Sequence, residues 1–569
     1  MTQPRSIASD SSRTITDSRG QIAHEAHVAH SERLVRKFYA VGDNAWCFVG
    51  NGLSNQTFVR GPEGIIAIDS GESVEELRAA IQELRRVASE PIVAVLYTHF
   101  HYVQGTAAVF EEATTPQGAA LPIWGHAGID GNRLRAGGII APAYLRGLVE
   151  QFAIRMPESG PDGVVNVGLG LAFRLADHAP WTNGYISPTN TFESTTVLNL
   201  AGLEIHVEPA PSDADDSVTY WFPSLGVAVH NLVWPALFNI FAIRGEEYRD
   251  PRVMLRGIDH LRSLEPAHII ATHGPPMSGT DEIATRVTRS RDAIQFLWDQ
   301  TVRWTNRGAT STELAHLVVL PEFYNEDYLT SELYGIVEHH TRQIRSGLFG
   351  FFDGDPQQLL PHAPVERSKR FIEAMGGKER VREMAGAALA DDLRWALELS
   401  GILVAAADSD EADRLLLSAA LRLVGQRTTS ANIRNWCITR ALDLEGALDM
   451  SPYKVHRVFP IQIMQWPIET AIGVLKVFVD PETTDGIDAH VAWNLDGEIA
   501  GLHFRNAIAC ETNGDGASST YVGSREDWGW VISGQGTIDQ AIDEGRFSVI
   551  GDAVSARNAL RCLDHDSFK

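Results

Sequence analysis

Cysteine is scarce in this chain of 569 residues, which holds only Cys47, Cys437, Cys510 and Cys562. They lie far apart and form no Cys-x-x-Cys pair, which argues against a disulfide framework and against a thiolate zinc site. Long apolar runs are lacking too, since no stretch approaches the roughly 18 apolar residues of a transmembrane helix. The polar N-terminus has no apolar signal segment. These absences predict a cytoplasmic protein in a reducing compartment.

Positive charge is in deficit, because 48 Lys and Arg stand against 73 Asp and Glu and give a formal net charge of −25. An acidic surface repels phosphate backbones and anionic lipids, so we expect neither a nucleic acid nor a membrane as partner. The hydrophobic fraction of 44% is ordinary for a globular protein. At roughly 100–200 residues per domain, the length predicts about three or four domains.

Strand and helix patterns alternate in the first half of the chain. EGIIAIDSG (63–71) predicts a buried strand that ends in a turn, ESVEELRAAIQELRRVA (72–88) has helical spacing, and PIVAVLYTHFH (91–101) returns to a buried strand. This order predicts an α/β layer architecture for residues 35–309. Residues 1–34 begin polar and are predicted to form a loose tail or an arm.

The periodicity changes twice further along the chain. Residues 310–448 have mostly helical spacing and predict an α-helical domain. After it, four stretches have the pattern of strands: KVHRVFPIQIMQW (454–466), GVLKVFVD (473–480), DAHVAWNL (488–495) and GLHFRNAIACE (501–511). We therefore predict a separate α+β domain over residues 449–569.

The stretch THFHYVQG (98–105) follows a predicted buried strand and contains two histidines, His99 and His101. Residues two apart in an extended segment point to the same side, so both imidazoles could chelate one metal ion. A transition metal usually also needs a carboxylate to balance its charge. A pair of loop histidines with ordinary hydrogen bonds is the simpler alternative.

Other polar residues stand at predicted strand ends in the same domain. SDADDS (212–217) carries Asp213 and Asp216, AVHN (228–231) ends in His230 and Asn231, and ATHGPP (271–276) contains His273. Taken singly, an acidic cluster is often a solvated turn or a helix cap, and a histidine at a strand end often only makes a hydrogen bond. Several of them in one α/β unit favour a shared site.

The order IDSG, THFH, acidic strand end and THG resembles the metallo-β-lactamase fold, and longer segments resemble its alkylsulfatase branch. These segments are FNIFAIRGEEYRDPRV (238–253), YGIVEHHTRQIRSGLFGFFDGDPQQLLP (334–361) and FIEAMGGKERVREMAGAALADDLRWALEL (371–399). The resemblance implies an αββα sandwich over 35–309, a dimerisation domain over 310–448 and a sterol-carrier-like domain over 449–569. It also implies a homodimer.

This sequence departs from the family's HxHxDH metal motif. In the family, the first two histidines bind one zinc, and the Asp and the last His bind a second. Here the last two positions are Val103 and Gln104. Valine cannot coordinate a metal, and a Gln carbonyl is a poor ligand for a borderline cation.

The resemblance assigns the remaining ligands by position. The carboxylate of the first metal falls at Asp213, with Asp216 as a competitor, and the late histidine of the second metal falls at His273. The bridging Glu of the family falls at His230 or near Asn231, depending on the alignment, so His230 could add a third imidazole. These substitutions predict one divalent metal in place of two.

The resemblance further implies a hydrolase that cleaves a sulfate-ester-like substrate with an apolar chain. Arg244 matches an arginine that grips the sulfate, and His339 and Arg342 match another pair of sulfate-pocket positions. Two histidines and one carboxylate suit zinc, which we favour, but also suit iron(II) in an oxygenase. A binding protein that has lost the chemistry is the third alternative.

Overall fold

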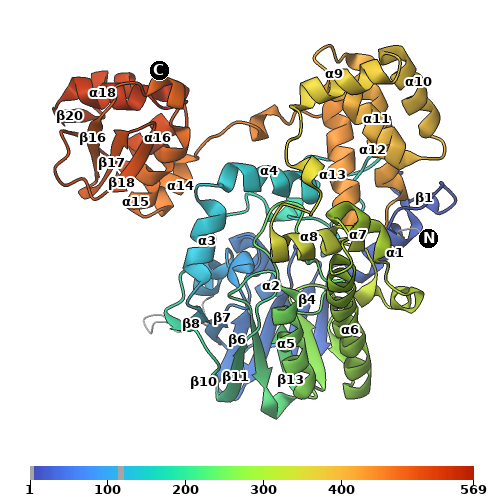
Figure 1. Ribbon diagram of the computed structural model, residues 1–569. Coiled ribbons are helices and arrows are strands. Elements are labelled where there is room, and N and C mark those ends of the chain that lie inside the picture. The colour runs from blue at the N-terminus through green and yellow to red at the C-terminus, as the bar shows by residue number, and fades with distance from the viewer. Residues whose placement is uncertain (1–5, 113–120, 569) are drawn as a thin grey trace. The chain divides into compact units, whose positions relative to one another are not determined.

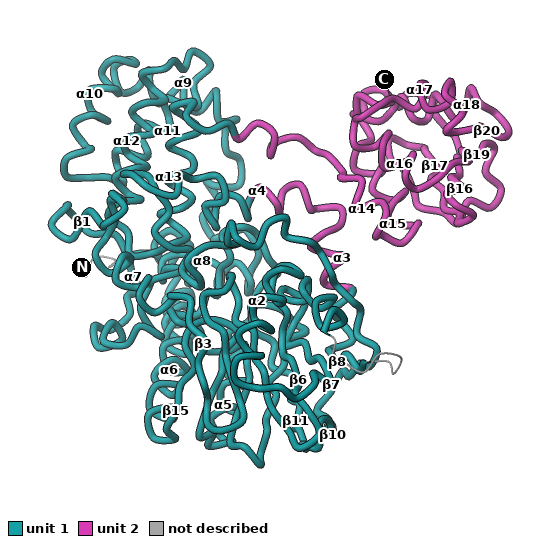
Figure 2. Tube along the Cα trace, turned by 180° about the vertical axis from the view of Figure 1, so that it is seen from behind, with its two compact units in different colours: residues 1–130, 147–449 teal, residues 131–146, 450–569 magenta. Residues whose placement is uncertain are grey.

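The computed structural model describes residues 6–112 and 121–568, and the chain forms two compact units (Figure 2). The first unit comprises residues 1–130 and 147–449, and the second comprises residues 131–146 and 450–569. Most of α3 (Ile129–Gly137) and the start of α4 (Ala141–Gln151) therefore belong to the second unit. No helix of the described residues is long and apolar enough to span a membrane.

The first unit contains a seven-stranded mixed sheet in the order β3-β4-β5-β6-β7-β8-β9. Strands β3 to β6 form an antiparallel meander, and β6 to β9 run parallel. The strands are β3 (Lys37–Val41), β4 (Ala45–Val49), β5 (Gln56–Gly61), β6 (Gly64–Ile68), β7 (Ile92–Leu96), β8 (Ile123–His126) and β9 (Asn190–Phe192).

A six-stranded sheet follows in the order β10-β11-β12-β13-β14-β15. Its strands are β10 (Thr196–Leu200), β11 (Leu203–Pro209), β12 (Val218–Phe222), β13 (Val227–His230), β14 (His268–Ala271) and β15 (Met277–Ser278). Only β13 and β14 pair in parallel, because α5 (Pro251–Ser263) returns the chain between them.

The two sheets pack face to face around one apolar core, which includes Val59, Ile66, Leu96, Ile205 and Val229. Helix α2 (Val74–Leu84), between β6 and β7, buries its apolar side, and α5 and α6 (Thr280–Thr305) cover the outer face of β13 and β14 (Figure 1). Burying each large aliphatic side chain contributes about 1.5–3 kcal/mol, which fixes the layers. The αββα sandwich predicted from the sequence is confirmed.

Helices dominate the rest of the first unit. They are α7 (Ser311–Leu317), α8 (Val337–Phe349), α9 (Pro364–Ala374), α10 (Lys378–Ala388), α11 (Leu393–Ala405), α12 (Glu411–Arg427) and α13 (Ala431–Leu444). Capping boxes start α7 at Thr310 and α12 at Asp410, so local sequence defines both N-termini. Helices α9 to α13 lie together in Figure 1, as the helical periodicity predicted.

The N-terminal segment is an ordered arm, so its interpretation as a loose tail is wrong for residues 6–34. It contains β1 (Thr14–Thr16), β2 (Ile22–His24) and α1 (Glu25–His30). Its backbone pairs with the end of α12, where Ala8 N donates to Arg427 O at 3.0 Å. The arm, the other prediction for this segment, is what the structure has, and His27 and His30 of α1 are buried in it.

Acidification should loosen this arm. Burial lowers the pKa of His30 from 6.5 to about 4, and that of His27 well below its ordinary value. Between about 4, the pKa of His30 in the folded arm, and its ordinary pKa of 6.5, the unfolded arm binds more protons than the folded arm. The free energy of unfolding therefore decreases as the pH falls. At about pH 5 the loss from His30 is on the order of 2 kcal/mol. Hydrogen exchange, corrected for intrinsic rates, should show reduced protection in residues 22–34; unchanged protection would contradict the prediction.

The second unit is an α+β domain, as predicted. Its sheet has the order β18-β17-β16-β19-β20 and consists of β16 (Ala489–Leu495), β17 (Glu498–Arg505), β18 (Ile508–Thr512), β19 (Ser519–Gly523) and β20 (Ser548–Gly551). The helices are α14 (Pro460–Gln465), α15 (Ile468–Gly473), α16 (Arg525–Ile532), α17 (Ile538–Asp543) and α18 (Ala553–Arg561). Its likeness to a sterol carrier stays a prediction.

Two of the four strands predicted at the start of this unit are wrong. Residues 454–466 contain helix α14, which begins at Pro460 and is capped by the Gln462 side chain on Phe459 N. Residues 474–478 form a 3-10 helix. Short apolar runs do not distinguish a strand from a buried helix, and here the proline at the first helical position decides.

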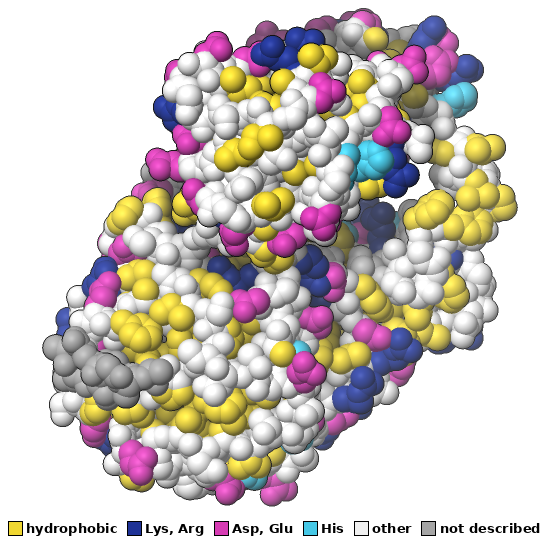
Figure 3. All heavy atoms as spheres, turned by 90° about the vertical axis from the view of Figure 1, so that its left-hand side faces the viewer, with side chains coloured by type: hydrophobic (Ala, Val, Ile, Leu, Met, Phe, Trp, Pro, Cys, Tyr) yellow, Lys and Arg dark blue, Asp and Glu magenta, His cyan; other side chains and the backbone are white. Residues whose placement is uncertain are grey.

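Acidic residues outnumber basic ones in this chain, which has a formal net charge of −25. On the face shown in Figure 3, acidic side chains are scattered among polar and apolar ones, with basic side chains near them.

Candidate metal centre

His99 and His101 come shortly after the carboxyl end of β7, an inner strand of the seven-stranded sheet. His99 has extended backbone, and residues Phe100–Tyr102 then form one turn of 3-10 helix instead of the predicted extended segment. This turn brings the two imidazoles together, with ring centroids 5.1 Å apart and planes at 74°. Both rings therefore face the same space, although by a different local structure from the one expected.

Asp213 completes a group of three metal-ligating residues. It lies in the loop between β11 and β12, and its Oδ2 is 3.7 Å from His99 Nε2 and 3.3 Å from His101 Nδ1. One ligand atom from each of the three lies within 4.8 Å of the others. Burial opposes ionisation of Asp213, but the neighbouring imidazoles hold its pKa well below its ordinary value.

Asp216, the competing carboxylate, is fully buried but does not belong to this group within the described residues. Burial raises the pKa values of Asp69 and Tyr220, and the negative charge of Asp216 raises them further.

A hydrogen-bond chain fixes the protonation of His99. Thr98 Oγ1 donates to Asp69 Oδ2 at 2.7 Å, so the same oxygen accepts a hydrogen bond from His99 Nδ1 at 2.8 Å. Burial lowers the pKa of His99 to about 3, which keeps the ring neutral. The unprotonated nitrogen is therefore Nε2, which faces Asp213 at 3.7 Å and lies 3.4 Å from Asn231 Nδ2.

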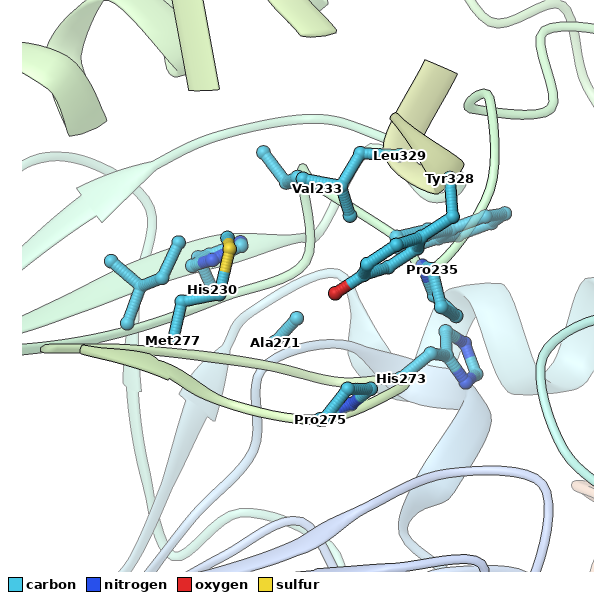
Figure 4. Close-up of a pocket in the computed structure, with 11 residues that line it drawn as sticks. His230, Val233, Pro235, Ala271, His273, Pro275, Met277, Tyr328 and Leu329 are labelled. Carbon is cyan, nitrogen blue, oxygen red and sulfur yellow. The ribbon is translucent and has the colours of Figure 1, made fainter. Parts of the chain in front are cut away.

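His230 lies away from the group, so its prediction as a third imidazole ligand is not supported. Its Nδ1 accepts from Leu232 N at 3.1 Å, and its ring lines a small pocket with Val233, Ala271 and Met277 (Figure 4). His230 is the last residue of β13, and neighbouring strand residues point to opposite faces. The next residue, Asn231, therefore faces the site.

Asn231 presents an amide nitrogen to the metal-ligating group. Trp234 Nε1, which can only donate, bonds Asn231 Oδ1 at 2.9 Å. The amide oxygen is thereby turned away, and Nδ2 donates to Asp213 Oδ1 at 2.5 Å. An N–H group cannot bind a cation, so in this orientation Asn231 does not replace a bridging carboxylate.

His273 also lies outside the group within the described residues, because both of its nitrogens are engaged. Its Nδ1 donates to Leu53 O at 2.9 Å, since a carbonyl can only accept. Burial lowers its pKa to about 4, so the neutral ring accepts from the Tyr102 hydroxyl through Nε2 at 3.2 Å. In Figure 4 the His273 ring points away from His230.

Val103 and Gln104 anchor the loop rather than extending the site. Val103 is fully buried, and its N–H donates to the side-chain oxygen of Gln104 at 3.0 Å. Gln104 N donates to Gly71 O at 3.1 Å, which ties this loop to the turn after β6. The side-chain carbonyl of Gln104 is thus hydrogen-bonded to the backbone N–H of Val103.

Glu246 was missed by sequence reasoning, although it lies two residues after Arg244. Its Oε1 is 3.3 Å from His101 Nε2 and 2.6 Å from Arg244 Nη2. Burial alone would lower the pKa of His101, but the carboxylates of Asp213 and Glu246 raise it to about 9. The Arg244 guanidinium also lies 5.7 Å from the Phe152 ring centre.

The other two predicted sulfate-pocket residues lie on α8. His339 packs against Phe241 with ring centroids 5.7 Å apart, and burial lowers its pKa to about 4. Arg342 is exposed, one helical turn further on. Neither belongs to the metal-ligating group found among residues 6–112 and 121–568.

The donor set fits a divalent transition metal. His101 Nδ1 is buried, and its 3.3 Å approach to Asp213 Oδ2 makes no well-aligned hydrogen bond. Two imidazole nitrogens and one carboxylate oxygen converge, as in catalytic sites that keep one position open for water or substrate.

Comparisons with known proteins give matches over most of the chain. The alkyl sulfatase dimerisation family matches residues 310–447. A linear primary-alkylsulfatase from Pseudomonas sp. is 31% identical over 528 residues, which span 89% of this chain and 98% of that protein. An (R)-specific secondary-alkylsulfatase from Pseudomonas sp. is 28% identical over 404 residues, which span 69% and 60% of the two chains.

A solved structure extends the likeness to the whole fold. The structure of a stereoselective inverting sec-alkylsulfatase from Pseudomonas sp. matches with a TM-score of 0.83 at 23% identity, over 99% of this chain and 93% of that one. The identity to the linear primary-alkylsulfatase over nearly its whole length shows that the chain belongs to the alkylsulfatase family.

Proposed function

We propose that this protein hydrolyses the sulfate ester of an apolar alcohol, using one divalent metal held by His99, His101 and Asp213. The observation that carries the proposal is the convergence of these three ligands, within 4.8 Å, in a chain of the alkylsulfatase family. The reaction consumes one water and releases an alcohol and hydrogen sulfate. Zinc is the metal that we favour.

The proposal of a single metal rests on the residues around the three ligands. Val103 carries no ligand atom, and the Gln104 carbonyl accepts from Val103 N. Asn231 turns an N–H towards Asp213, and His273 is engaged by Leu53 O and Tyr102. Val103, Gln104 and Asn231 thus offer no ligand to a second metal, and the Tyr102 hydroxyl competes for Nε2 of His273.

When bound, a divalent metal would polarise an ester oxygen and lower the pKa of a coordinated water towards about 7. A bound metal would displace the Nδ1 proton that the raised pKa of His101 otherwise retains. Two neutral imidazoles and one carboxylate would then leave such a site with net positive charge. That charge favours an anionic sulfate group. Arg244, 7% exposed and linked to His101 through Glu246, would add a second cation for the same group.

The other sulfate-binding candidates, His339 and Arg342, stay proposals. The apolar stretch that includes Leu232, Val233, Trp234 and Phe238 packs in the core and keeps water from the inner side of the site. The family relationship does not favour the iron oxygenase or the binding protein as alternatives.

The direct test is sulfate release from octyl sulfate by the zinc-loaded protein, measured alongside oxygen consumption. Stoichiometric release of sulfate without oxygen uptake is expected. Oxygen-dependent turnover of an iron-loaded preparation, with no sulfate released by the zinc form, would overturn the proposal.

We also propose that the chain forms a homodimer through the segment between α8 and α9. This segment lies within the matched dimerisation region, and it exposes Phe351 at 88% and Leu360 at 92%. Exposed apolar side chains of this size are typical of protein–protein interfaces.

Replacing both Phe351 and Leu360 with Asp should convert the dimer into a monomer, since buried charges oppose association. Light scattering coupled to size-exclusion chromatography would measure the mass. The control is Val554→Asp, at a 70% exposed position of α18 in the second unit, which should leave the mass unchanged. A dimer that survives the double substitution would contradict this assignment.

A further inference from the structure

Glu246 is a buried carboxylate between the metal-ligating group and Arg244. Its side chain is 7% exposed, as is that of Arg244, and the two are joined by a 2.6 Å ion pair. Because a guanidinium always keeps its protons, this ion pair holds Glu246 as a carboxylate, which can only accept hydrogen bonds.

The contact between Glu246 and His101 selects one form of the imidazole. Because Glu246 Oε1 can only accept, the hydrogen between it and His101, at 3.3 Å, belongs to His101 Nε2. The other nitrogen, Nδ1, lies 3.3 Å from Asp213 Oδ2 and is the atom that faces the ligand group. Glu246 thus fixes both the rotation of the ring and the nitrogen that is left to bind a metal.

His99 is held in an equivalent way from the other side. Thr98 Oγ1, itself fixed by Asp69, accepts from His99 Nδ1 and leaves Nε2 to face Asp213. The two histidines thus use opposite nitrogens towards one carboxylate, and each is oriented by an acceptor on its far side.

We propose that Glu246 is a positioning residue for the metal centre, which it orients through His101 while Arg244 balances its charge. The inference rests on the proposed metal site. Arg244 then has two roles. Its guanidinium would hold the sulfate, and it also neutralises Glu246, the carboxylate that accepts from His101.

Metal affinity tests this role directly. Metal-stripped protein is titrated with Zn²⁺ against a fluorescent chelator, for the wild type and for Glu246→Gln and Glu246→Ala. Loss of a carboxylate behind a ligating histidine typically weakens metal binding by about 10–100-fold. We expect Glu246→Ala to bind most weakly and Glu246→Gln, whose amide oxygen can still accept, to lie between it and the wild type.

Controls separate this inference from its alternatives. Glu247→Gln, at the exposed neighbouring position, should bind Zn²⁺ like the wild type, and circular dichroism of the metal-free variants checks their folding. Raising the Zn²⁺ concentration should restore the activity of Glu246→Gln, which a role in substrate binding alone would not allow. Wild-type affinity in both Glu246 variants, with binding lost in His101→Ala, would overturn the inference and leave the proposed function intact. A wild type that binds no Zn²⁺ would overturn both.

Discussion

Replacing Asp213 with Asn should abolish tight metal binding and lower kcat/KM by at least about 10³-fold, equivalent to roughly 4 kcal/mol of transition-state stabilisation. The substitution keeps the shape of the side chain but removes the one anionic ligand, whose Oδ2 lies 3.7 Å from His99 Nε2 and 3.3 Å from His101 Nδ1. Without it the two neutral imidazoles are left to hold a divalent cation alone. Chelator competition measures the affinity, and sulfate release measures the activity.

The matched control for this experiment is Asp216→Asn. Asp216 lies in the same loop and is also buried, but it does not belong to the ligand group in the described part of the chain. The Asp216→Asn variant should therefore retain one tightly bound metal. Loss of the metal in Asp216→Asn, with normal binding in Asp213→Asn, would show that the assignment of the two carboxylates is reversed.

Replacing Gly105 with Ala should lower the free energy of unfolding by about 3 kcal/mol and weaken metal binding. An added Cβ would lie 2.1 Å from Ser70 O and 2.5 Å from Ser73 O. These are backbone atoms, so one of the two loops must move. The shift would reach the metal ligands, because Gln104 N is bonded to Gly71 O and His101 lies only three residues before Gln104. Chemical denaturation and zinc titration measure the two effects.

The control for Gly105 is Gly386→Ala, within helix α10, where an added Cβ would have no atom within 4 Å. Alanine is preferred to glycine in a helix by up to about 1 kcal/mol, so this variant should be unchanged or more stable. A Gly105→Ala protein as stable as the wild type would show that the two loops tolerate separation.

Local patterns were sufficient to predict the α/β layers, the helical region and two of the proposed metal ligands. Apolar strands that alternate with helices predict an α/β layer architecture, because each face of a sheet must be covered. The αββα sandwich was implied by the family resemblance. His99 and His101 were visible as a pair because they are neighbours in sequence. The 3-10 turn that joins them was not, since nothing in THFHYVQG distinguishes it from an extended segment.

The rest of the site depends on which face of a strand each residue occupies. His230 and Asn231 were interchangeable in the sequence, but only Asn231 points into the site, because β13 ends at His230 and its alternation turns that ring away. The orientation of Asn231 is set by Trp234, three residues later, and the loss of His273 as a ligand is set by Tyr102 and Leu53. Such partnerships between distant segments leave no periodic signal in the sequence.

Glu246 illustrates the same limit. It lies within FNIFAIRGEEYRDPRV, yet only the fold brings it to His101, 145 positions earlier in the chain. The signal available in the sequence was the acidic pair Glu246 and Glu247 after Arg244. A carboxylate beside an arginine that is predicted to bind sulfate is unfavourable for binding that anion, so its presence indicates another role.

The central claim is that this alkylsulfatase-like chain holds one metal per site, where the family motif holds two. It is tested by measuring the metal content of the protein, purified without chelator, by mass spectrometry against its concentration. The arrangement of Asn231, Val103, Gln104 and His273 predicts about one tightly bound divalent metal per chain, lost in Asp213→Asn. Two tightly bound metals per chain, or one that persists in that variant, would contradict it.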